Sequence, residues 1–231
     1  MQTSPDTRRE SYERLINQMP ARLKRPSFKE LALNKFPFPK SKLFIHVLRW
    51  SGMRIGKNVK ILGRVKFKIR GKFENIIIHD NVVIAKNVDL RNRENGSIEI
   101  KEKAYLDENV RIVAAREGSV VIDKAAEIGA NTIINSGGNT YIGEFALLAG
   151  FININSSSHG TGKHSYIKDQ PHEHGSVYIG NDVWIGSFAA VLMNSSIGEG
   201  AIIGSHSVVK GDIPDFGVAV GVPAKVIKSR T

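Results

Sequence analysis

Apolar residues recur along this chain at a spacing of six, and this spacing constrains the fold more than any other feature of the sequence. The clearest run has glycine after four of its six members: Ile179, Ile185, Val191, Ile197, Ile203 and Val209. A helix repeats every 3.6 residues and a strand every two, so neither alone produces this period. Small residues such as Ala189 and Ala201 stand four places after the apolar residue. Each hexapeptide is therefore expected to form one short strand and one tight corner, and three of them would close a triangular coil.

The same spacing occurs earlier in the chain, in five groups of three residues. They are Ile55, Ile61 and Phe67; Ile78, Ile84 and Leu90; Ile100, Leu106 and Ile112; Ile122, Ile128 and Ile134; Ile142, Leu148 and Ile154. Extra residues follow only the third member of a group, and the longest insertion adds nineteen residues between Ile154 and Ile179. All insertions should thus leave the same corner of a three-sided coil. The sequence predicts an all-β fold, a parallel β-helix of about seven coils that is roughly 30 Å tall.

Three segments near the C-terminus carry a resemblance to a known family: IGNDVWIGSFAAVL, IGEGAIIGSHSVV and IPDFGVAVGVPAKVIK. They resemble the hexapeptide-repeat acetyltransferases, particularly the sugar O-acetyltransferases and the xenobiotic acetyltransferases, and the resemblance covers about residues 55 to 228. It implies a left-handed β-helix, although right-handed crossovers are the general rule for parallel strands. It also implies a homotrimer in which acetyl-CoA, the acetyl donor, binds in the groove between subunits.

The expected domain organisation has three parts. These are a basic, partly helical N-terminal arm (1–54), the β-helix (55–209) with an active-site loop (155–178), and a C-terminal tail (210–231) that contacts the cofactor. The first 50 residues hold eleven Lys and Arg against four acids, in a chain of net charge +11. Residues 41–50 predict a short helix with Ser41 as N-cap and with Leu43, Val47 and Trp50 on one stripe. Capping of the open end of the solenoid is the expected role, and peripheral contact with an anionic membrane surface is the alternative.

Composition limits the catalytic mechanisms and the cellular locations that we expect for this protein. The chain has no Cys, which excludes a cysteine nucleophile and an acyl-enzyme on sulfur. We expect a cytoplasmic protein, at most attached to the inner face of the membrane, since there is neither a signal-peptide pattern nor an apolar stretch of about 18 residues. No nucleic-acid partner is expected, because no basic stripe is interleaved with aromatic residues.

The longest insertion contains four of the seven histidines, His159, His164, His172 and His174. Transfer of an acetyl group to a hydroxyl needs a base, and a neutral imidazole with a pKa of about 6.5 suits that role near pH 7. In the resembled enzymes the base is a His sixteen residues after the Gly of an Ile-Gly pair, and Gly143 stands sixteen residues before His159. His159 is the predicted general base. The other three histidines are expected to be bystanders in a polar loop.

A zinc site is a weaker interpretation of the same histidines. His159 and His164 stand five apart, as zinc ligands do in the β-helical carbonic anhydrases. Such a site needs a third His on the preceding coil, and no His occurs between His79 and His159. The ligand set is incomplete, so no metal is predicted.

The resemblance also implies residues that bind the substrates. Trp184 and Asn131 match positions that bind the acceptor, although packing in a subunit interface is an equal alternative for Trp184. The acetyl-CoA contacts would be Ser187, Gly204, Ser205, Lys225 and Lys228. The two lysines would hold the phosphates of the nucleotide, as fixed positive charge does. This chain departs from the family at two places: the family often has Ala in place of Ser205 and Thr-Lys in place of Lys210-Gly211.

The predicted function is acetyl-CoA-dependent O-acetylation of a saccharide, such as a bacterial surface polysaccharide or its precursor. An N-acetyltransferase of a nucleotide-linked amino sugar could use the same base, but some such enzymes carry an extra domain for which about 50 preceding residues are too few. Inactivation of a xenobiotic or antibiotic stays open. A purely structural β-helix is disfavoured by the long insertion and the basic tail.

Overall fold

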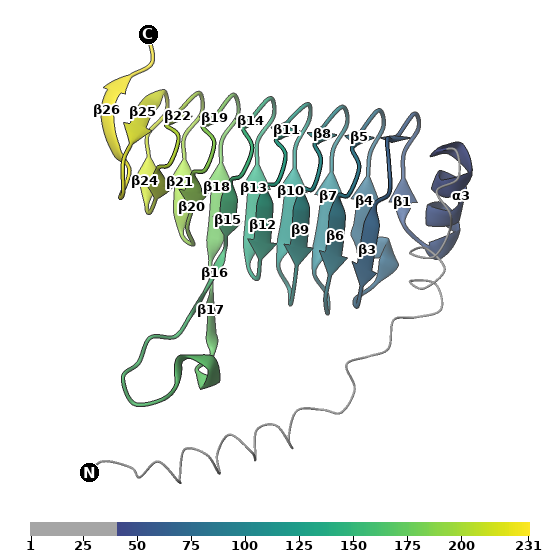
Figure 1. Ribbon diagram of the computed structural model, residues 1–231, viewed down its shortest axis with the longest axis horizontal. Coiled ribbons are helices and arrows are strands. Elements are labelled where there is room, and N and C mark those ends of the chain that lie inside the picture. Colours follow the sequence, from purple (N-terminus) through teal and green to yellow (C-terminus); the bar gives the residue numbers. More distant parts are fainter. Residues whose placement is uncertain (1–40) are drawn as a thin grey trace.

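The computed structural model describes residues 41–231, which form one long parallel β-solenoid with a helix at its N-terminal end (Figure 1). Three sheets run along its length, and we call them A, B and C. Sheet A contains β1 (Arg54–Ile55), β4 (Ile76–Ile78), β7 (Ser97–Ile100), β10 (Ser119–Ile122), β13 (Asn139–Ile142), β18 (Ser176–Ile179), β21 (Ser195–Ile197) and β24 (Asp212–Ile213).

Sheet B has nine strands, of which the last is antiparallel to its neighbour. They are β2 (Lys60–Ile61), β5 (Val83–Ile84), β8 (Tyr105–Leu106), β11 (Glu127–Ile128), β14 (Leu147–Leu148), β19 (Trp184–Ile185), β22 (Ile202–Ile203), β25 (Gly217–Val220) and β26 (Lys225–Ser229). Sheet C has seven: β3 (Lys66–Ile69), β6 (Asp89–Asn92), β9 (Arg111–Ala114), β12 (Ile133–Ser136), β15 (Asn153–Asn155), β20 (Ala190–Val191) and β23 (Val208–Val209). The chain passes from A to B to C in every coil, which confirms the predicted solenoid and is consistent with a left-handed β-helix.

The hexapeptide spacing sets the direction of each side chain. Residues of the predicted apolar positions pair across successive coils, as Ile122 does with Ile142 and Ile128 with Leu148. All of these positions are buried except Ile55, which is half-buried in the first coil. The corners need a left-handed backbone, and asparagine often provides it, for example at Asn109. Each insertion leaves the solenoid between sheet C and the next strand of sheet A, as expected.

The solenoid continues beyond residue 209. Strands β24 and β25 extend sheets A and B into an eighth, incomplete coil, and β26 then folds back antiparallel on β25. The antiparallel strand covers the edge of sheet B that further coils would otherwise have extended. Residues 210–231 are thus part of the sheet structure and end the solenoid.

Helix α3 (Ser41–Ser51) covers the first coil, as a cap requires. Phe44, Ile45 and Leu48 are buried in the core cluster, and the rings of Phe44 and Phe67 lie 6.3 Å apart between centroids. The predicted stripe was wrong by about one residue position, since Leu43 is 57% exposed. Sequence spacing gives the period of a helix, but the plane of the coil end decides which stripe is buried.

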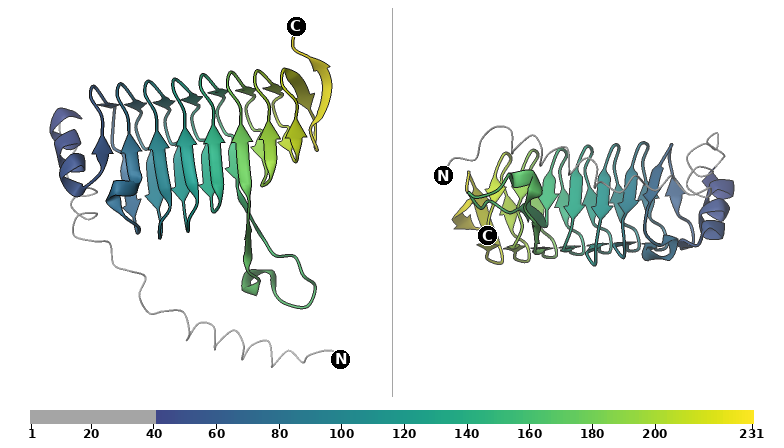
Figure 2. Two further views of the ribbon diagram at one scale, coloured as in Figure 1. Left: turned by 180° about the vertical axis from the view of Figure 1, so that it is seen from behind. Right: turned by 90° about the horizontal axis from the view of Figure 1, so that it is seen from below.

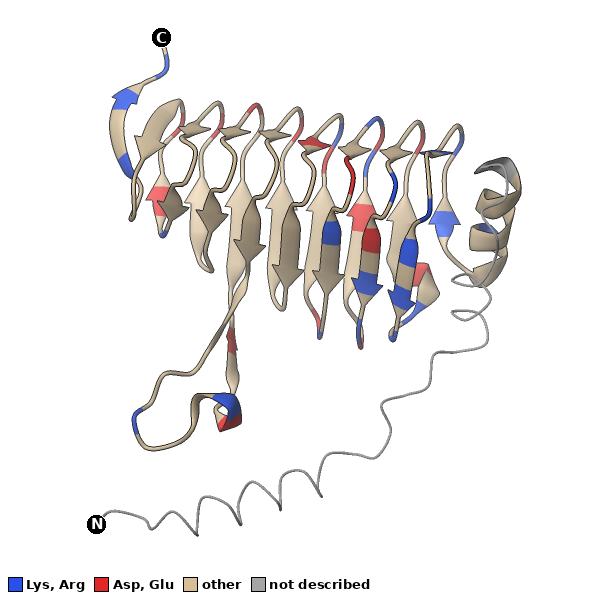
Figure 3. Cartoon of the chain, in the orientation of Figure 1, with Lys and Arg blue, Asp and Glu red and all other residues tan. Residues whose placement is uncertain are grey.

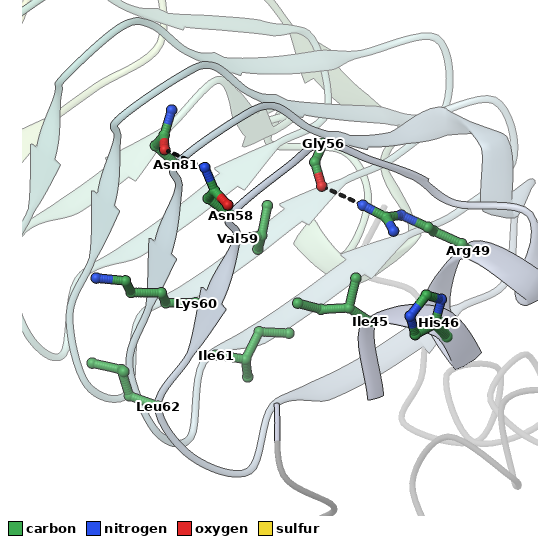
Figure 4. Close-up of a pocket in the computed structure, with 10 residues that line it drawn as sticks. All are labelled: Ile45, His46, Arg49, Gly56, Asn58, Val59, Lys60, Ile61, Leu62 and Asn81. Atoms are coloured by element: carbon green, nitrogen blue, oxygen red, sulfur yellow. Dashed lines mark hydrogen bonds between the residues drawn. The ribbon is translucent and has the colours of Figure 1, made fainter. Parts of the chain in front are cut away.

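A cavity of about 760 Å³ lies between α3 and the first coil (Figure 4). There Ile45 lies near Ile61, and the guanidinium of Arg49 donates to the carbonyl oxygens of Ile55 and Gly56. The side chain of Ser41 and the expected basic arm up to residue 40 lie outside the described residues. No helix within residues 41–231 is long and apolar enough to span a membrane.

Candidate active site

The longest insertion forms a β-hairpin that projects away from the solenoid (Figures 1 and 2). Its strands are β16 (Ser157–His159) and β17 (His172–His174), which pair with each other in antiparallel orientation. β16 follows β15 directly in the chain. The tip contains the short helix η2 (Ile167–Asp169), and the side chain of Gln170 holds the tip together. Its Oε1 accepts from the Gly162 amide at 2.7 Å and its Nε2 donates to the Gly162 carbonyl at 2.7 Å. The loop expected at 155–178 therefore has regular structure.

Buried hydroxyl groups anchor the base of the hairpin to the preceding coil. Ser136, Thr140 and Ser156 are at most 2% exposed. The Ser136 Oγ lies 3.0 Å from Thr140 Oγ1 and 3.1 Å from Ser156 Oγ, and Ser156 Oγ accepts from the amide of Gly138 at 3.1 Å. Because buried polar atoms are costly without partners, this network favours one position of the chain where β16 begins.

The hairpin brings three histidines together. His159 pairs with His172 across the ladder, and their ring centroids lie 4.1 Å apart. His174 follows on the same face of β17, 6.1 Å from His172. The pKa of His174 is lowered by partial burial at the hairpin base, and next by the charges of Arg116 and His172. A lowered pKa favours the neutral imidazole near pH 7.

The other three histidines were expected in a polar loop, but two of them lie in a strand. Strand β17 holds His172 and His174, whereas His164 lies in the exposed tip. Sequence spacing alone did not show this, because the pairing depends on where the long insertion reverses. The alternation of histidines in His172-Glu173-His174 was the available signal, since alternate residues of a strand share a face.

A cleft of about 490 Å³ lies between the hairpin base and the outer face of sheet C. From the hairpin, Ser157, His172 and His174 line it. Arginines of β6, β9 and the neighbouring corners line the other side. The exposed His159 stands next to this cleft through its contact with His172. The site thus combines an accessible imidazole with a strongly basic wall.

Three of the predicted cofactor residues meet at the corner between sheets B and C. A Cβ added to Gly186 would lie 2.7 Å from the Oγ of Ser205, so glycine permits the close approach of the two coils. The carbonyl of Ser187 accepts from the amide of His206 at 3.0 Å. Gly204 lies over Val220, which pairs with Lys225 of β26. Lys228 lies on the same exposed strand, opposite Val218.

An aromatic stack that the sequence interpretation missed runs along this corner. Phe151 stacks on Phe188 at 4.8 Å, and Phe188 stacks on His206 at 5.0 Å, between ring centroids. Phe151 and Phe188 are both 52% exposed. All three residues occupy the left-handed corner position of successive coils, and this recurrence was the signal that could have identified them.

The two predicted acceptor residues lie apart from each other. Trp184 is half exposed on sheet B, between Leu147 and Ile202 of the adjacent strands. Asn131 lies at the corner before β12 and lines a second cleft, of about 630 Å³, on sheet C. The hairpin leaves from the corner between sheets C and A, so one chain does not bring Trp184 beside His159. Within residues 41–231, no three His, Cys, Asp or Glu side chains are placed to hold a metal ion.

Comparison with known proteins agrees with this architecture. Residues 176–211 match the family described as bacterial transferase hexapeptide (six repeats). A probable acetyltransferase of Mycobacterium tuberculosis is 35% identical over 169 residues, which are 72% of this chain and 55% of the relative. The putative lipopolysaccharide biosynthesis O-acetyl transferase WbbJ of Escherichia coli is 33% identical over 144 residues, 59% of this chain and 74% of WbbJ.

Among solved structures, the fold is shared with the polySia specific acetyltransferase NeuO. The TM-score is 0.54 at 23% identity, over 76% of this chain and 83% of NeuO. The chain spans about half the length of the mycobacterial relative but most of WbbJ. The repeat, the fold and the identity with WbbJ together show that this chain belongs to the hexapeptide-repeat acetyltransferase family.

Proposed function

We propose that this protein transfers an acetyl group from acetyl-CoA to a hydroxyl of a saccharide, and that His159 is the general base. The acceptor would be a bacterial surface polysaccharide or its precursor. The observation that carries the proposal is the position of His159 on an ordered, projecting hairpin beside a polar cleft. The identity with WbbJ, whose name describes lipopolysaccharide O-acetylation, supports the acceptor class.

In the proposed reaction His159 accepts the proton of the acceptor hydroxyl as its oxygen attacks the thioester carbonyl. The carbon–sulfur bond breaks, and the proton is returned to the departing thiolate of CoA. His159 suits this role because its ring is exposed and is positioned by His172. General bases of this kind contribute about 10²- to 10⁴-fold to the rate.

The corner between sheets B and C fits a nucleotide thioester. Ser205 is exposed, and Lys225 and Lys228 are exposed on β26 with no ion pair among the described residues. These cations suit the phosphates of CoA, and the stacked rings of Phe151 and Phe188 offer an apolar surface beside them. Bound acetyl-CoA would supply the activated acetyl group there.

A homotrimer is part of the proposal. In one chain the cofactor corner lies between sheets B and C, whereas the hairpin leaves between sheets C and A. A neighbouring subunit would bring its hairpin, with His159, to that corner, and Trp184 of the first chain would contact the acceptor. Light scattering should give a mass close to three times 25.4 kDa.

The test is acetyl-CoA consumption by the wild type and by His159→Ala, with a panel of sugars, sugar nucleotides and surface glycans. We expect a product that is one acetyl group heavier, labile to alkali and absent with the variant. An alkali-stable acetyl would indicate an amine acceptor instead, and acetylation of a drug-like hydroxyl alone would indicate a xenobiotic acetyltransferase. Full activity of His159→Ala would remove His159 from the mechanism. Failure of acetyl-CoA to bind would favour a structural β-helix.

A further inference from the structure

Sheet C carries an unusual concentration of positive charge on its outer face. Lys66, Lys68, Arg91 and Arg111 point outward from β3, β6 and β9, where blue segments are visible in Figure 3. Asp89 is the one acid among the outward residues of these three strands. Two clefts, of about 630 and 490 Å³, lie over this face. Arg91 and Arg111 line both clefts, so the two are neighbouring parts of one groove.

Two acids line the groove: Glu94 accepts from the Arg116 amide at 2.7 Å, and Asp89 is engaged by an arginine. Both carboxylate oxygens of Asp89 accept from Arg91, with Nε at 2.9 Å from Oδ1 and the terminal nitrogen on Oδ2. Asp89 is 8% exposed and is the register neighbour of both Lys66 and Arg111. Among the described residues no ion pair joins Asp89 to Arg111, so the charge of Arg111 is left without a matched acceptor there.

Arg111 has an unsatisfied donor at the centre of the groove. Its Nε is buried and is the one buried side-chain nitrogen or oxygen of the described residues that lacks a hydrogen-bond partner. No ion pair to its guanidinium is found within residues 41–231. A buried donor without a partner is costly and needs an explanation, and an arginine fork is suited to carboxylate or phosphate.

The two ends of the groove indicate what it would hold. At the corner between sheets B and C it is edged by three carboxamides with left-handed backbone, Asn87, Asn109 and Asn131. Amides of this kind can both donate to and accept from sugar hydroxyls. At the other end the groove reaches Ser157, His172 and His174 of the hairpin. The face from β3 to β12 extends for about 14 Å, at about 4.8 Å per coil.

We propose that this groove on sheet C binds the acceptor through an anionic group, a carboxylate or phosphate carried by the saccharide, which Arg111 contacts directly. The inference rests on the proposed function, and it names an acidic saccharide as the substrate class. The anion would sit on Arg111 while neighbouring hydroxyls contact the asparagines. A hydroxyl farther along the same molecule would then lie toward the hairpin and His159.

The experiment measures binding without acetyl-CoA, so it does not depend on catalysis. Oligogalacturonate, pyrophosphate and neutral dextran oligosaccharide are titrated into the full chain, and calorimetry is repeated with Arg111→Gln. A matched control, Lys103→Gln, removes one positive charge from the same coil at an exposed corner between sheets A and B. CoA is titrated as a further ligand to test the cofactor site separately.

We expect an acidic ligand to bind more tightly than dextran. Arg111→Gln should weaken the affinity for the acidic ligand about tenfold or more, because a charged hydrogen bond is lost. Lys103→Gln should bind the acidic ligand as the wild type does. Arg111→Gln should bind CoA as the wild type does. Preference for oligogalacturonate over pyrophosphate would identify a carboxylate ligand, and the reverse a phosphate. Equal weakening by both variants would reduce the effect to net charge and overturn the proposal.

Two further outcomes would also overturn it. If dextran binds as tightly as the acidic probes, the groove does not select an anion. If Arg111→Gln changes the mass in light scattering, this face is an interface between copies of the chain. In either case His159→Ala should still abolish acetyl transfer, because that assay tests the proposed function and not the groove. A failure of the groove proposal is therefore distinguishable from a failure of the proposed function.

Discussion

His172 lies directly across the β16–β17 ladder from His159, with 4.1 Å between the two ring centroids and an angle of 45° between their planes. The contact joins two residues that the hairpin tip separates in sequence. It restricts the orientation of an otherwise exposed imidazole, and orientation of a base is a large part of its catalytic effect.

Replacement of these two histidines should therefore have unequal effects. His159→Ala should lower kcat by about 10²- to 10⁴-fold through loss of the base. His172→Ala should lower kcat by about tenfold, because the contact that positions His159 is lost. His172→Phe, which restores a ring, should recover most of that loss. Steady-state kinetics on the identified acceptor provide the measurement, and equal damage by His172→Phe and His172→Ala would contradict a positioning role.

Gly137→Ala should displace the hairpin base. An added Cβ would lie 2.5 Å from Nδ1 of His174 and 3.2 Å from the Cβ of Ser157. The imidazole must then move, and we expect kcat to fall by about tenfold as the histidines lose their arrangement. Hydrogen exchange of residues 157–174 should increase. Gly162→Ala is the control, because its Cβ would make an ordinary 3.4 Å contact with Gln170. Equal kinetics for the two variants would contradict the prediction.

Ser156→Ala should destabilise the fold by about 1–3 kcal/mol. The substitution removes the acceptor of the Gly138 amide and the partner of Ser136 from a site where Ser156 is fully buried. Chemical denaturation measures the change in the free energy of unfolding. Ser158→Ala, at an exposed position in the same strand, should stay within about 0.5 kcal/mol of the wild type.

Asp123 should make stability depend on acid pH. Burial raises the pKa of its carboxyl, but hydrogen bonds from Lys101, Tyr141 and the Lys124 amide outweigh burial, so the pKa is lowered from 3.8. The donor distances are 2.8, 2.8 and 2.7 Å. The unfolded chain therefore binds this proton more readily than the folded chain. The stabilisation by the Asp123 carboxylate is present above pH 3.8 and is lost as the pH falls through the lower pKa of the folded state.

Denaturation of Asp123→Asn at several pH values tests this. At pH 7 the variant should be less stable by about 1–3 kcal/mol, since it loses the charged hydrogen bonds. The difference from the wild type should shrink as the pH is lowered toward 3 and below. A difference that is constant with pH would mean that the carboxylate charge contributes nothing.

Lys225→Ala should raise KM for acetyl-CoA about three- to tenfold and leave kcat unchanged, because one cation near the phosphates would be lost far from the reacting atoms. Lys228→Ala should act in the same direction. Lys210→Ala, an exposed lysine in the corner before β24, is the matched control and should leave KM as it is. An unchanged KM in both β26 variants would move the nucleotide away from this strand.

The spacing of apolar residues was sufficient to predict the repeat and most of the core. The inward residues, the three-sided coil and the corner at which insertions leave all follow from the spacing of six, because each hexapeptide forms its strand and corner from local preferences. The family followed from the segments around Ile179 and Ile197. The resemblance, through the spacing of His159 from Gly143, also predicts His159 as the base, and that role stays a prediction.

The contacts between residues of different coils could not be predicted in this way, because they depend on the three-dimensional packing. The buried stripe of α3 depends on the plane of the first coil, and the contact of His172 with His159 depends on where the hairpin reverses. The burial of the Arg111 Nε without a hydrogen-bond partner likewise depends on how the neighbouring coils pack. These relationships depend on how a hairpin reverses or on how neighbouring coils stack, and a periodic pattern carries no information on such pairings because every coil repeats the same pattern.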